Sequence, residues 1–225
     1  MRTFRICHLY GNLLNTYGDN GNLLMLQYHA QKRGMDVLTE VVTIDDPFDP
    51  TAYDLVFFGG GQDYEQKVIA KQIQSIRPGL QEFIEKDGVV LAICGGYQLL
   101  GHYYVNAKGE KLPGLGILDH FTERQINHRF TGDTKIYSDY FKRELIGFEN
   151  HNGVTHLGKN QKAFGKVIQG YGNNGKDQTE GTHYRNTFGS YFHGPLLVKN
   201  DWLTDELIDL ALSNQQTPKV EALGN

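Results

Sequence analysis

The first half of the chain alternates short apolar runs with segments whose apolar residues recur at helical spacing. The continuous runs predict strands at 4–9, 37–44, 55–58 and 89–93. The periodic segments predict helices at 21–32 and 65–86, and Pro78 must break or kink the second of these. Strands that alternate with helices are typical of βαβ units. We therefore predict an α/β fold built on an open, mostly parallel sheet with helices on both faces.

The pattern of apolar and polar residues changes after about residue 105. Short strand-like pieces at 116–122, 134–137, 145–148, 166–169 and 188–192 are separated by Gly, Asn, Asp and Lys, as in antiparallel strands added to the sheet. An amphipathic helix is predicted at 201–212, with Asp201 or Thr204 near its start. We predict one domain over residues 1–212 and a C-terminal tail at 213–225.

Composition narrows the possible classes of protein. The 225 residues are 39% hydrophobic and 21% charged, with a net charge of −4, which argues against a nucleic-acid partner. No apolar run reaches the roughly 20 residues of a membrane helix, and no signal peptide is evident, so we expect a cytoplasmic protein without membrane insertion. The two cysteines have no partner at metal-ligand spacing, so neither a disulfide framework nor a metal site is expected.

Two glycine-rich turns follow predicted buried strands, Gly59-Gly60-Gly61 and Cys94-Gly95-Gly96. Ligands of open parallel sheets bind at the carboxyl ends of the strands, so neighbouring turns would line one crevice. A cysteine at a sharp turn from strand to helix has the geometry of a nucleophile elbow, where backbone N–H groups favour a thiolate. The N–H groups of Gly95 and Gly60 could then stabilise an oxyanion. The alternative is that Cys94 is a small buried hydrophobic residue.

A cysteine nucleophile needs a base, and nine histidines are available. His193 ends the run Phe188-Gly-Ser-Tyr-Phe-His and is followed by Gly-Pro, which places it at the end of a predicted strand. His8, His151 and His183 lie in other strand-like pieces and compete with it. The pattern of residues alone leaves this choice open.

Several motifs together resemble a class I (triad-type) glutamine amidotransferase. They are the strand leading into Cys94-Gly-x-x-Gln98, the glycine turn after the preceding strand, and a strand-end histidine 99 residues after the cysteine. Gly147-Phe-Glu-Asn-His-Asn-Gly153 and Tyr191-Phe-His-Gly-Pro195 are similar to segments of the cobyric-acid-synthase-like branch. Five segments, in the order in which they occur, resemble segments of the glutaminase subunits of lipid II isoglutaminyl synthases: CGGYQLLG, LPGLGILD, GFENHNG, GYGNN and HGPLL.

The resemblance implies a flavodoxin-like sheet and a set of site residues. Cys94 would attack the carboxamide of L-glutamine and His193 would move the protons. Gly60 and Gly95 would form the oxyanion hole. Gln98 would face the bound glutamine, and Arg129, in Asn127-His-Arg-Phe-Thr-Gly132, would bind its α-carboxylate. Without the resemblance, Arg129 reads as a solvated loop arginine. No cofactor is implied.

One position departs from the family pattern. Many class I amidotransferases carry an acid two residues after the histidine, where this chain has Pro195. The orienting acid would then come from Glu149 or from a partner subunit. A dyad without a fixed orienting acid is expected to hydrolyse glutamine slowly until its partner binds.

The polar segment Asn15-Thr-Tyr-Gly-Asp-Asn-Gly-Asn22 follows the first predicted strand. Its plain interpretation is a loop that ends in a helix cap, with Asp19 or Asn20 as the N-cap residue. Because it lies at the functional edge of the sheet, it could also contact a partner or the ammonia exit. We expect capping.

The resemblance also implies a partner. The chain has no GxxxxGK[ST] loop for ATP, so a Mur-ligase-like (MurT-type) ATP-dependent synthetase subunit would form a heterodimer with it and amidate the D-glutamate α-carboxylate of lipid II. Alternatives are an amidotransferase for a cobyrinate-type synthase, a non-catalytic binding module on the same fold, and a cysteine peptidase or esterase.

Overall fold

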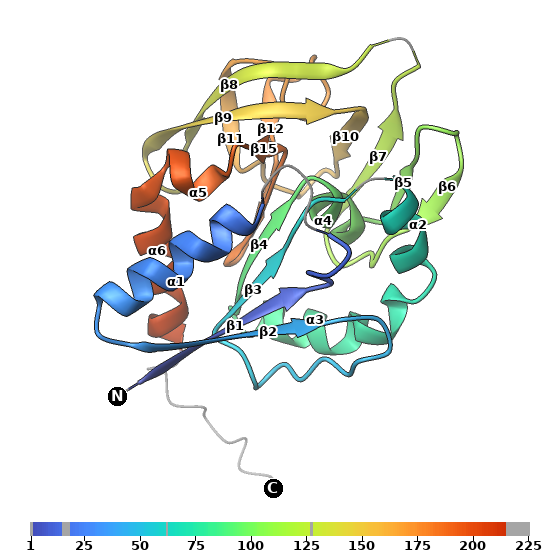
Figure 1. Ribbon diagram of the computed structural model, residues 1–225. Coiled ribbons are helices and arrows are strands. Elements are labelled where there is room, and N and C mark those ends of the chain that lie inside the picture. Colours follow the sequence, from blue (N-terminus) through green and yellow to red (C-terminus); the bar gives the residue numbers. More distant parts are fainter. Residues whose placement is uncertain (1, 15–18, 62, 127, 215–225) are drawn as a thin grey trace, which may run out of the picture.

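A six-stranded sheet forms the centre of the molecule (Figure 1), in the order β13-β14-β4-β3-β1-β2. The computed structural model describes residues 2–14, 19–61, 63–126 and 128–214. All neighbours in this sheet are parallel except β13 and β14, which are antiparallel. The strands are β1 (Thr3–Leu9), β2 (Asp36–Val42), β3 (Leu55–Phe58), β4 (Val89–Ile93), β13 (Thr182–Tyr184) and β14 (Thr187–Ser190). The predicted mostly parallel sheet is therefore confirmed.

Helices cover both faces of this sheet, so its central strands are buried on both sides. Successive side chains of a strand point to opposite faces, so in β3 Val56 and Phe58 enter one core while Leu55 and Phe57 enter the other. The first core is closed by α2 (Asp63–Ala70), the 3₁₀ helix η2 (Ile73–Ile76), α3 (Arg77–Glu85) and α4 (Gly95–Leu100). The second is closed by α1 (Asn20–Lys32), α5 (Leu196–Lys199) and α6 (Asp201–Asn214).

Two smaller sheets follow the parallel half of the chain. One has the order β10-β7-β5-β6, and the other has the order β12-β11-β8-β9-β15 and lies beyond the carboxyl ends of β3 and β4, at the top of Figure 1. Their strands are β5 (Tyr103–Val105), β6 (Lys111–Pro113), β7 (His120–Arg124), β8 (Phe130–Ser138), β9 (Arg143–His151), β10 (Gly153–Leu157), β11 (Gly165–Gln169), β12 (Thr179–Glu180) and β15 (Phe192–His193). Apart from one β5–β7 pair the described pairings are antiparallel, as predicted.

The helical pattern at 65–86 is interrupted twice. Helix α2 ends at Ala70, η2 follows, and α3 begins at Arg77 with Pro78 in its first turn. Proline is tolerated there because the first N–H groups of a helix have no partner within the helix. The predicted break is confirmed, and α6 reaches Asn214, two residues beyond its predicted end. The remainder of the tail lies outside the described residues.

The strand predicted at 116–122 is wrong in its first half, since β7 begins only at His120. The N–H groups of Leu115 to Leu118 instead donate to the carbonyls of Leu99, Leu100 and Gly101. These carbonyls lie at the end of α4, where a helix leaves them without partners of its own. Capping that helix end therefore prevails over strand pairing in this segment.

The run predicted as one strand at 188–192 crosses between two sheets. Strand β14 ends at Ser190 in the central sheet, and β15 begins at Phe192 beside β9. Between them, the N–H of Tyr191 donates to Glu180 Oε1 at 2.7 Å, and the Ser190 hydroxyl donates to the same oxygen at 3.1 Å. This buried carboxyl replaces the ladder partner, so His193 ends a strand of the five-stranded sheet.

Candidate active site

The two glycine turns identified in the sequence lie side by side, because β3 and β4 are neighbours in register. The N–H of Gly96 donates to the carbonyl of Gly59 at 3.0 Å and joins the turns directly. A side chain at position 96 would place its Cβ 2.3 Å from the carbonyl oxygen of Phe58, so only glycine fits this approach. The expected single crevice at the carboxyl edge of the sheet is confirmed.

Cys94 occupies a strained turn between β4 and α4. Its φ of 49° and ψ of −102° are unusual for a residue with a side chain. The backbone is held on both sides, since the N–H of Cys94 donates to Ser190 O at 2.8 Å and the N–H of Gln98 donates to Cys94 O at 3.0 Å. Such strain persists where surrounding contacts enforce it, often at functional sites. Cys94 is partly exposed, whereas Cys7 is buried and burial raises the pKa of its thiol.

His193 is the histidine that the fold brings to Cys94. A Cβ built on Gly60 would lie 3.2 Å from Cys94 Cβ and 3.6 Å from His193 Cε1, so both side chains border the same glycine. On its other side, His193 Nδ1 lies 3.4 Å from Asp19 Oδ1. Asp19 Oδ2 also accepts the N–H of Gly60 at 2.8 Å. Cysteine, histidine and aspartate thus form a connected series around Gly60.

The charge state of His193 follows from this arrangement. Burial lowers the pKa of His193, but its hydrogen bond to Asp19, the nearby Cys94 and the charges of both outweigh burial and raise the pKa from 6.5 to about 10. The imidazole is therefore protonated at neutral pH. An imidazolium beside a cysteine favours the thiolate, which is the nucleophilic form.

The same pKa predicts how stability depends on pH. Because the pKa of His193 is raised on folding, its stabilising contribution is complete below about pH 6.5 and is lost as the pH rises through about 10. The free energy of unfolding of the wild type, relative to His193→Gln, should fall over that interval. Urea unfolding at a series of pH values measures it. A difference that stays constant from pH 6.5 to 10 would contradict the assignment.

Asp19 or Asn20 was expected to cap α1, and this is confirmed for Asp19 in position but not in the role of its side chain. It occupies the N-cap position, but its side chain makes no capping hydrogen bond and is fully buried against His193 and Gly60. Residues 15–18 of the same polar segment lie outside the described residues. The contact with His193 spans 174 positions, so nothing in the local sequence pattern could reveal it.

Glu149 does not lie at His193 as an orienting acid. Although Glu149 pairs with Phe192 in the β9–β15 ladder, its carboxylate accepts the N–H groups of Tyr171 at 2.7 Å and Gly172 at 2.9 Å. The geometry corrects the sequence-based expectation, and Asp19 takes the position proposed for Glu149. The slow hydrolysis expected without a partner rested on a missing acid, and Asp19 removes that reason.

None of the other candidate histidines has a described hydrogen bond to Asp19, although His151 lines the cavity that Cys94 borders. His8 is buried at the end of β1, and burial lowers its pKa to about 4. His151 is buried near Glu149, with the Nε2 and Oε2 atoms 3.9 Å apart. His183 lies on β13 and its Nε2 contacts the Arg185 carbonyl at 2.7 Å.

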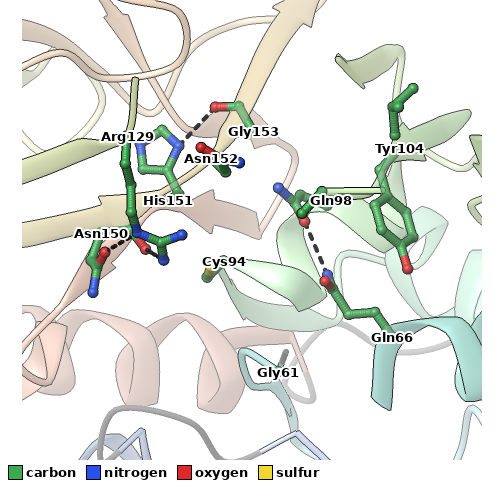
Figure 2. A pocket seen from close by; sticks show the side chains of 12 residues that line it. Gly61, Gln66, Cys94, Gln98, Tyr104, Arg129, Asn150, His151, Asn152 and Gly153 are labelled. Carbon is green, nitrogen blue, oxygen red and sulfur yellow. Dashed lines mark hydrogen bonds between the residues drawn. The ribbon is translucent and has the colours of Figure 1, made fainter. Parts of the chain in front are cut away.

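A cavity of about 400 Å³ opens beside Cys94 (Figure 2). Its lining includes Gln98 and Arg129, the two residues expected to bind substrate. Arg129 is exposed, and its guanidinium donates from Nε to Asn150 Oδ1 at 2.5 Å and from Nη2 to Asn150 O at 3.1 Å. Asn150 therefore directs Arg129 along the cavity wall, a contact that the sequence pattern did not indicate.

Gln98 is held at the opposite wall of the cavity. Its Oε1 accepts a hydrogen bond from Gln66 Nε2 at 3.0 Å, and its own Nε2 donates to the Tyr191 hydroxyl at 3.1 Å. Gln66 is buried in α2 and was not singled out from the sequence. Of the two expected oxyanion donors, Gly95 begins α4, whereas the N–H of Gly60 is bonded to Asp19.

Comparison with known proteins decides the family. The model of the CobB/CobQ-like glutamine amidotransferase domain matches residues 5–201. The chain belongs to this family. Two solved structures share the fold of this amidotransferase. A glutamine amidotransferase has a TM-score of 0.55 and 16% sequence identity, and the match covers 91% of this chain and 98% of the other. The glutaminase domain of Trypanosoma brucei CTPS has a TM-score of 0.56 and 12% sequence identity, and the match covers 93% of this chain and 94% of the other.

Relatives with higher identity are similar over almost the whole amidotransferase. The lipid II isoglutaminyl synthase (glutamine-hydrolyzing) subunit GatD of Streptococcus pneumoniae is 52% identical, covering 93% of this chain and 81% of the relative. The protein of the same name from Staphylococcus aureus is 42% identical, covering 97% and 88%. The cobyric acid synthase of Listeria monocytogenes is 29% identical over 72% of this chain but only 32% of its own length. In the described part of the chain, no helix combines the length and hydropathy needed to span a membrane.

Proposed function

We propose that this amidotransferase is the glutamine-hydrolysing subunit of a lipid II isoglutaminyl synthase. The observation that carries the proposal is the connected arrangement of Cys94, His193 and Asp19 at the edge of a cavity lined by Arg129 and Gln98. A nucleophile, a base and an orienting acid in contact, beside a cavity with a cation for a carboxylate, suit the hydrolysis of an amino-acid amide.

The reaction begins with attack of the Cys94 thiolate on the carboxamide carbon of glutamine. The N–H of Gly95 stabilises the oxyanion that develops, and the N–H of Gly60 joins it once released from Asp19. The His193 imidazolium gives its proton to the leaving nitrogen, the C–N bond breaks, and ammonia departs from a γ-glutamyl thioester. His193 then takes a proton from water, which attacks the thioester and releases glutamate and the thiolate. The sum is glutamine and water to glutamate and ammonia.

Substrate position follows from the two walls of the cavity. The Arg129 guanidinium binds the α-carboxylate of glutamine, and a planar fork of N–H donors suits a carboxylate. Gln98 faces the substrate from the first turns of α4. Because Gln66 and Tyr191 hold its amide in place, Gln98 offers the ligand a fixed surface.

The product and partner are proposed from the relatives. The chain is 52% and 42% identical to the two GatD subunits but 29% identical to the Listeria cobyric acid synthase, which favours the lipid II enzyme. It would form a heterodimer with a MurT-type, Mur-ligase-like synthetase that uses ATP and transfers the ammonia to the D-glutamate α-carboxylate of lipid II. A cytoplasmic location is part of this proposal and rests on the sequence.

A diazoketone analogue of glutamine tests the substrate class. The analogue should alkylate Cys94 selectively, because the cavity binds its amino-acid end and places the reactive carbon at the thiolate. Mass spectrometry of the intact chain and its peptides should give one adduct, at Cys94, and excess glutamine should slow its formation. Failure to label with or without the synthetase partner, while iodoacetamide still reacts at Cys94, would overturn glutamine as the substrate.

A further inference from the structure

The segment Glu149–Gly153 connects β9 to β10 and forms one wall of the cavity beside Cys94. Asn150 holds Arg129 on the cavity side of this segment. Glu149 and His151 alternate with it and are 1% and 2% exposed. Two buried ionisable side chains at a substrate wall, His151 in the lining itself and Glu149 next to it, need a physical reason, because burying charge is costly unless it is compensated.

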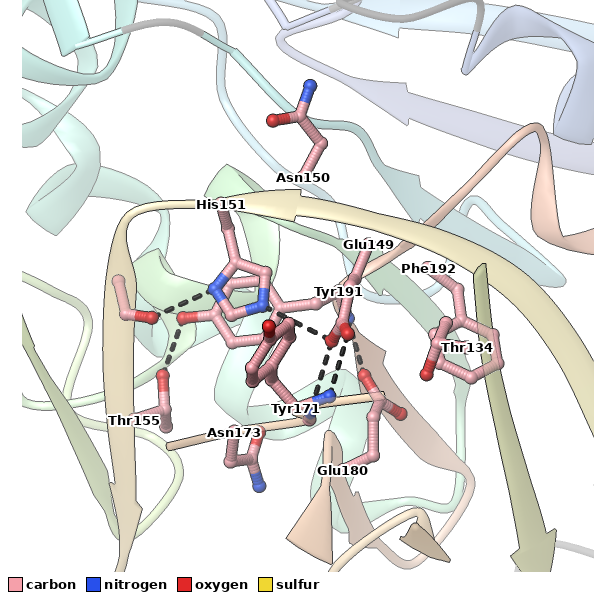
Figure 3. Close-up of polar contacts among 12 residues, drawn as sticks. Thr134, Glu149, Asn150, His151, Thr155, Tyr171, Asn173, Glu180, Tyr191 and Phe192 are labelled. Carbon is pink, nitrogen blue, oxygen red and sulfur yellow. Dashed lines mark hydrogen bonds and ion pairs between the residues drawn. The ribbon is translucent and has the colours of Figure 1, made fainter. Parts of the chain in front are cut away.

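Glu149 fastens a second loop to this wall (Figure 3). Its Oε1 accepts the N–H of Tyr171 at 2.7 Å and its Oε2 accepts the N–H of Gly172 at 2.9 Å. A Cβ on Gly170 would lie 2.7 Å from Glu149 Oε1, so the turn is closed tightly around the carboxylate. Two charge-assisted hydrogen bonds compensate the buried charge and join the 170–172 turn to β9.

His151 connects this wall to the side of the cavity that holds Gln98. Its Nδ1 donates to the carbonyl of Gly153 at 2.8 Å, which joins the end of β9 to the start of β10. Its ring lies flat on Tyr191, with centroids 3.6 Å apart and planes 3° from parallel. The Tyr191 hydroxyl in turn accepts the N–H of Gln98 and contacts Thr155 Oγ1 at 2.6 Å.

The aromatic packing continues outward from His151. Phe130 lies edge-on to the His151 ring at 5.4 Å and stacks on Tyr171 at 4.6 Å, and the N–H of Tyr171 is one of the two bound by Glu149. The Glu149 carboxylate and the His151 ring are therefore linked through the Tyr171–Phe130 stack, and His151 Nε2 also approaches Glu149 Oε2 at 3.9 Å.

We propose that Glu149 and His151 are a pair of positioning residues that shape the glutamine cavity, holding Asn150 and Arg129 on one wall and Tyr191 and Gln98 on the other. This inference rests on the proposed function, since it assigns the pair to that same site. The pair acts on substrate binding and leaves the reacting groups Cys94, His193 and Asp19 in place.

Glu149→Gln tests the proposal, because an amide offers one acceptor where two N–H groups need two, and it also removes the charge. Inactivation by the diazoketone glutamine analogue is followed as a function of its concentration. The concentration for half-maximal inactivation should rise about tenfold, whereas the rate at saturation should stay within about twofold of the wild type. Alkylation by iodoacetamide, which does not need the cavity, should be unchanged.

Asp177→Asn is the matched control. Asp177 is an exposed carboxylate in the same loop that accepts the N–H of Thr179 at 2.9 Å and the Thr179 hydroxyl at 2.7 Å, and no described contact joins it to His151. This variant should weaken the loop without changing the half-saturating concentration. His151→Asn should reproduce the effect of Glu149→Gln, and the double variant should add little to either single one.

Two outcomes would overturn the inference. One is an unchanged half-saturating concentration in Glu149→Gln. The other is an equal rise in the Asp177→Asn control, which would indicate general loosening of the loop. If the wild type itself is labelled by iodoacetamide but not by the glutamine analogue, the proposed function fails instead, and the two failures are distinguished in one experiment.

Discussion

Alanine in place of Cys94 should abolish glutamine hydrolysis, with a loss of about 10⁵-fold or more. Without the sulfur no thioester can form, and the remaining oxyanion donors and substrate contacts cannot divide the reaction into two easier steps. Ammonia release measured with a coupled dehydrogenase, alone and with the synthetase partner, gives the rate. His193→Ala should fall to a similar level, because the two side chains act as a unit around Gly60.

Cys7→Ala is the matched control for this loss. Cys7 is fully buried on β1, and its side chain belongs to the core beneath the sheet. Its removal should lower the free energy of unfolding by about 1 kcal/mol, through the small cavity it leaves, and keep the rate of ammonia release. Full activity in Cys94→Ala would show that another group is the nucleophile, and equal inactivation by both changes would point to misfolding.

Asparagine in place of Asp19 should lower kcat by about 10² to 10⁴-fold. Oδ1 of Asp19 lies at His193 Nδ1 and Oδ2 accepts the N–H of Gly60. An amide keeps the shape but loses the charge that raises the pKa of His193, and it has one acceptor oxygen for the two donors. The imidazolium then loses its partner, and Cys94 becomes a poorer nucleophile.

The pH dependence of iodoacetamide alkylation at Cys94 measures this effect directly. In Asp19→Asn, alkylation near neutral pH should be slower than in the wild type. The control is Asp54→Asn, since Asp54 is also buried and its carboxylate also accepts a backbone N–H, from Arg5 at 2.7 Å, at a distance from the site. Retention of the full rate by Asp19→Asn in the complex would mean that the orienting acid comes from the partner subunit.

The arrangement of the central sheet could be predicted because its information is local. The run Leu55 to Phe58 is apolar at every position, and a strand buried on both faces requires that pattern. The predictions failed where a distant polar group competes for the backbone. Glu180 ends the ladder at Tyr191, and the carbonyls at the end of α4 take the N–H groups of 115–118. Neither competing group can be recognised from the sequence of the segment whose backbone it binds.

The site likewise has features that the sequence predicts and features that it does not. A cysteine between an apolar run and two glycines indicates an elbow, and the strained turn at Cys94 has that form. The choice among the acids could not be made from spacing. The sequence suggested Asp19 as a helix cap and Glu149 as an orienting acid. In the structure the Asp19 carboxylate lies at His193, and Glu149 is bonded to the 170–172 turn.

By itself the sequence determined the α/β architecture, the turn that presents Cys94, and a strand end that carries His193. These features depend on the periodic pattern of buried residues within each segment and on glycines at positions where two stretches of backbone approach each other closely. Only the tertiary structure decided which carboxylate meets the histidine and which polar groups hold Arg129 and Gln98. A hydrogen bond needs its two atoms within about 3 Å, and for residues far apart in the chain the packing of the whole domain sets that distance.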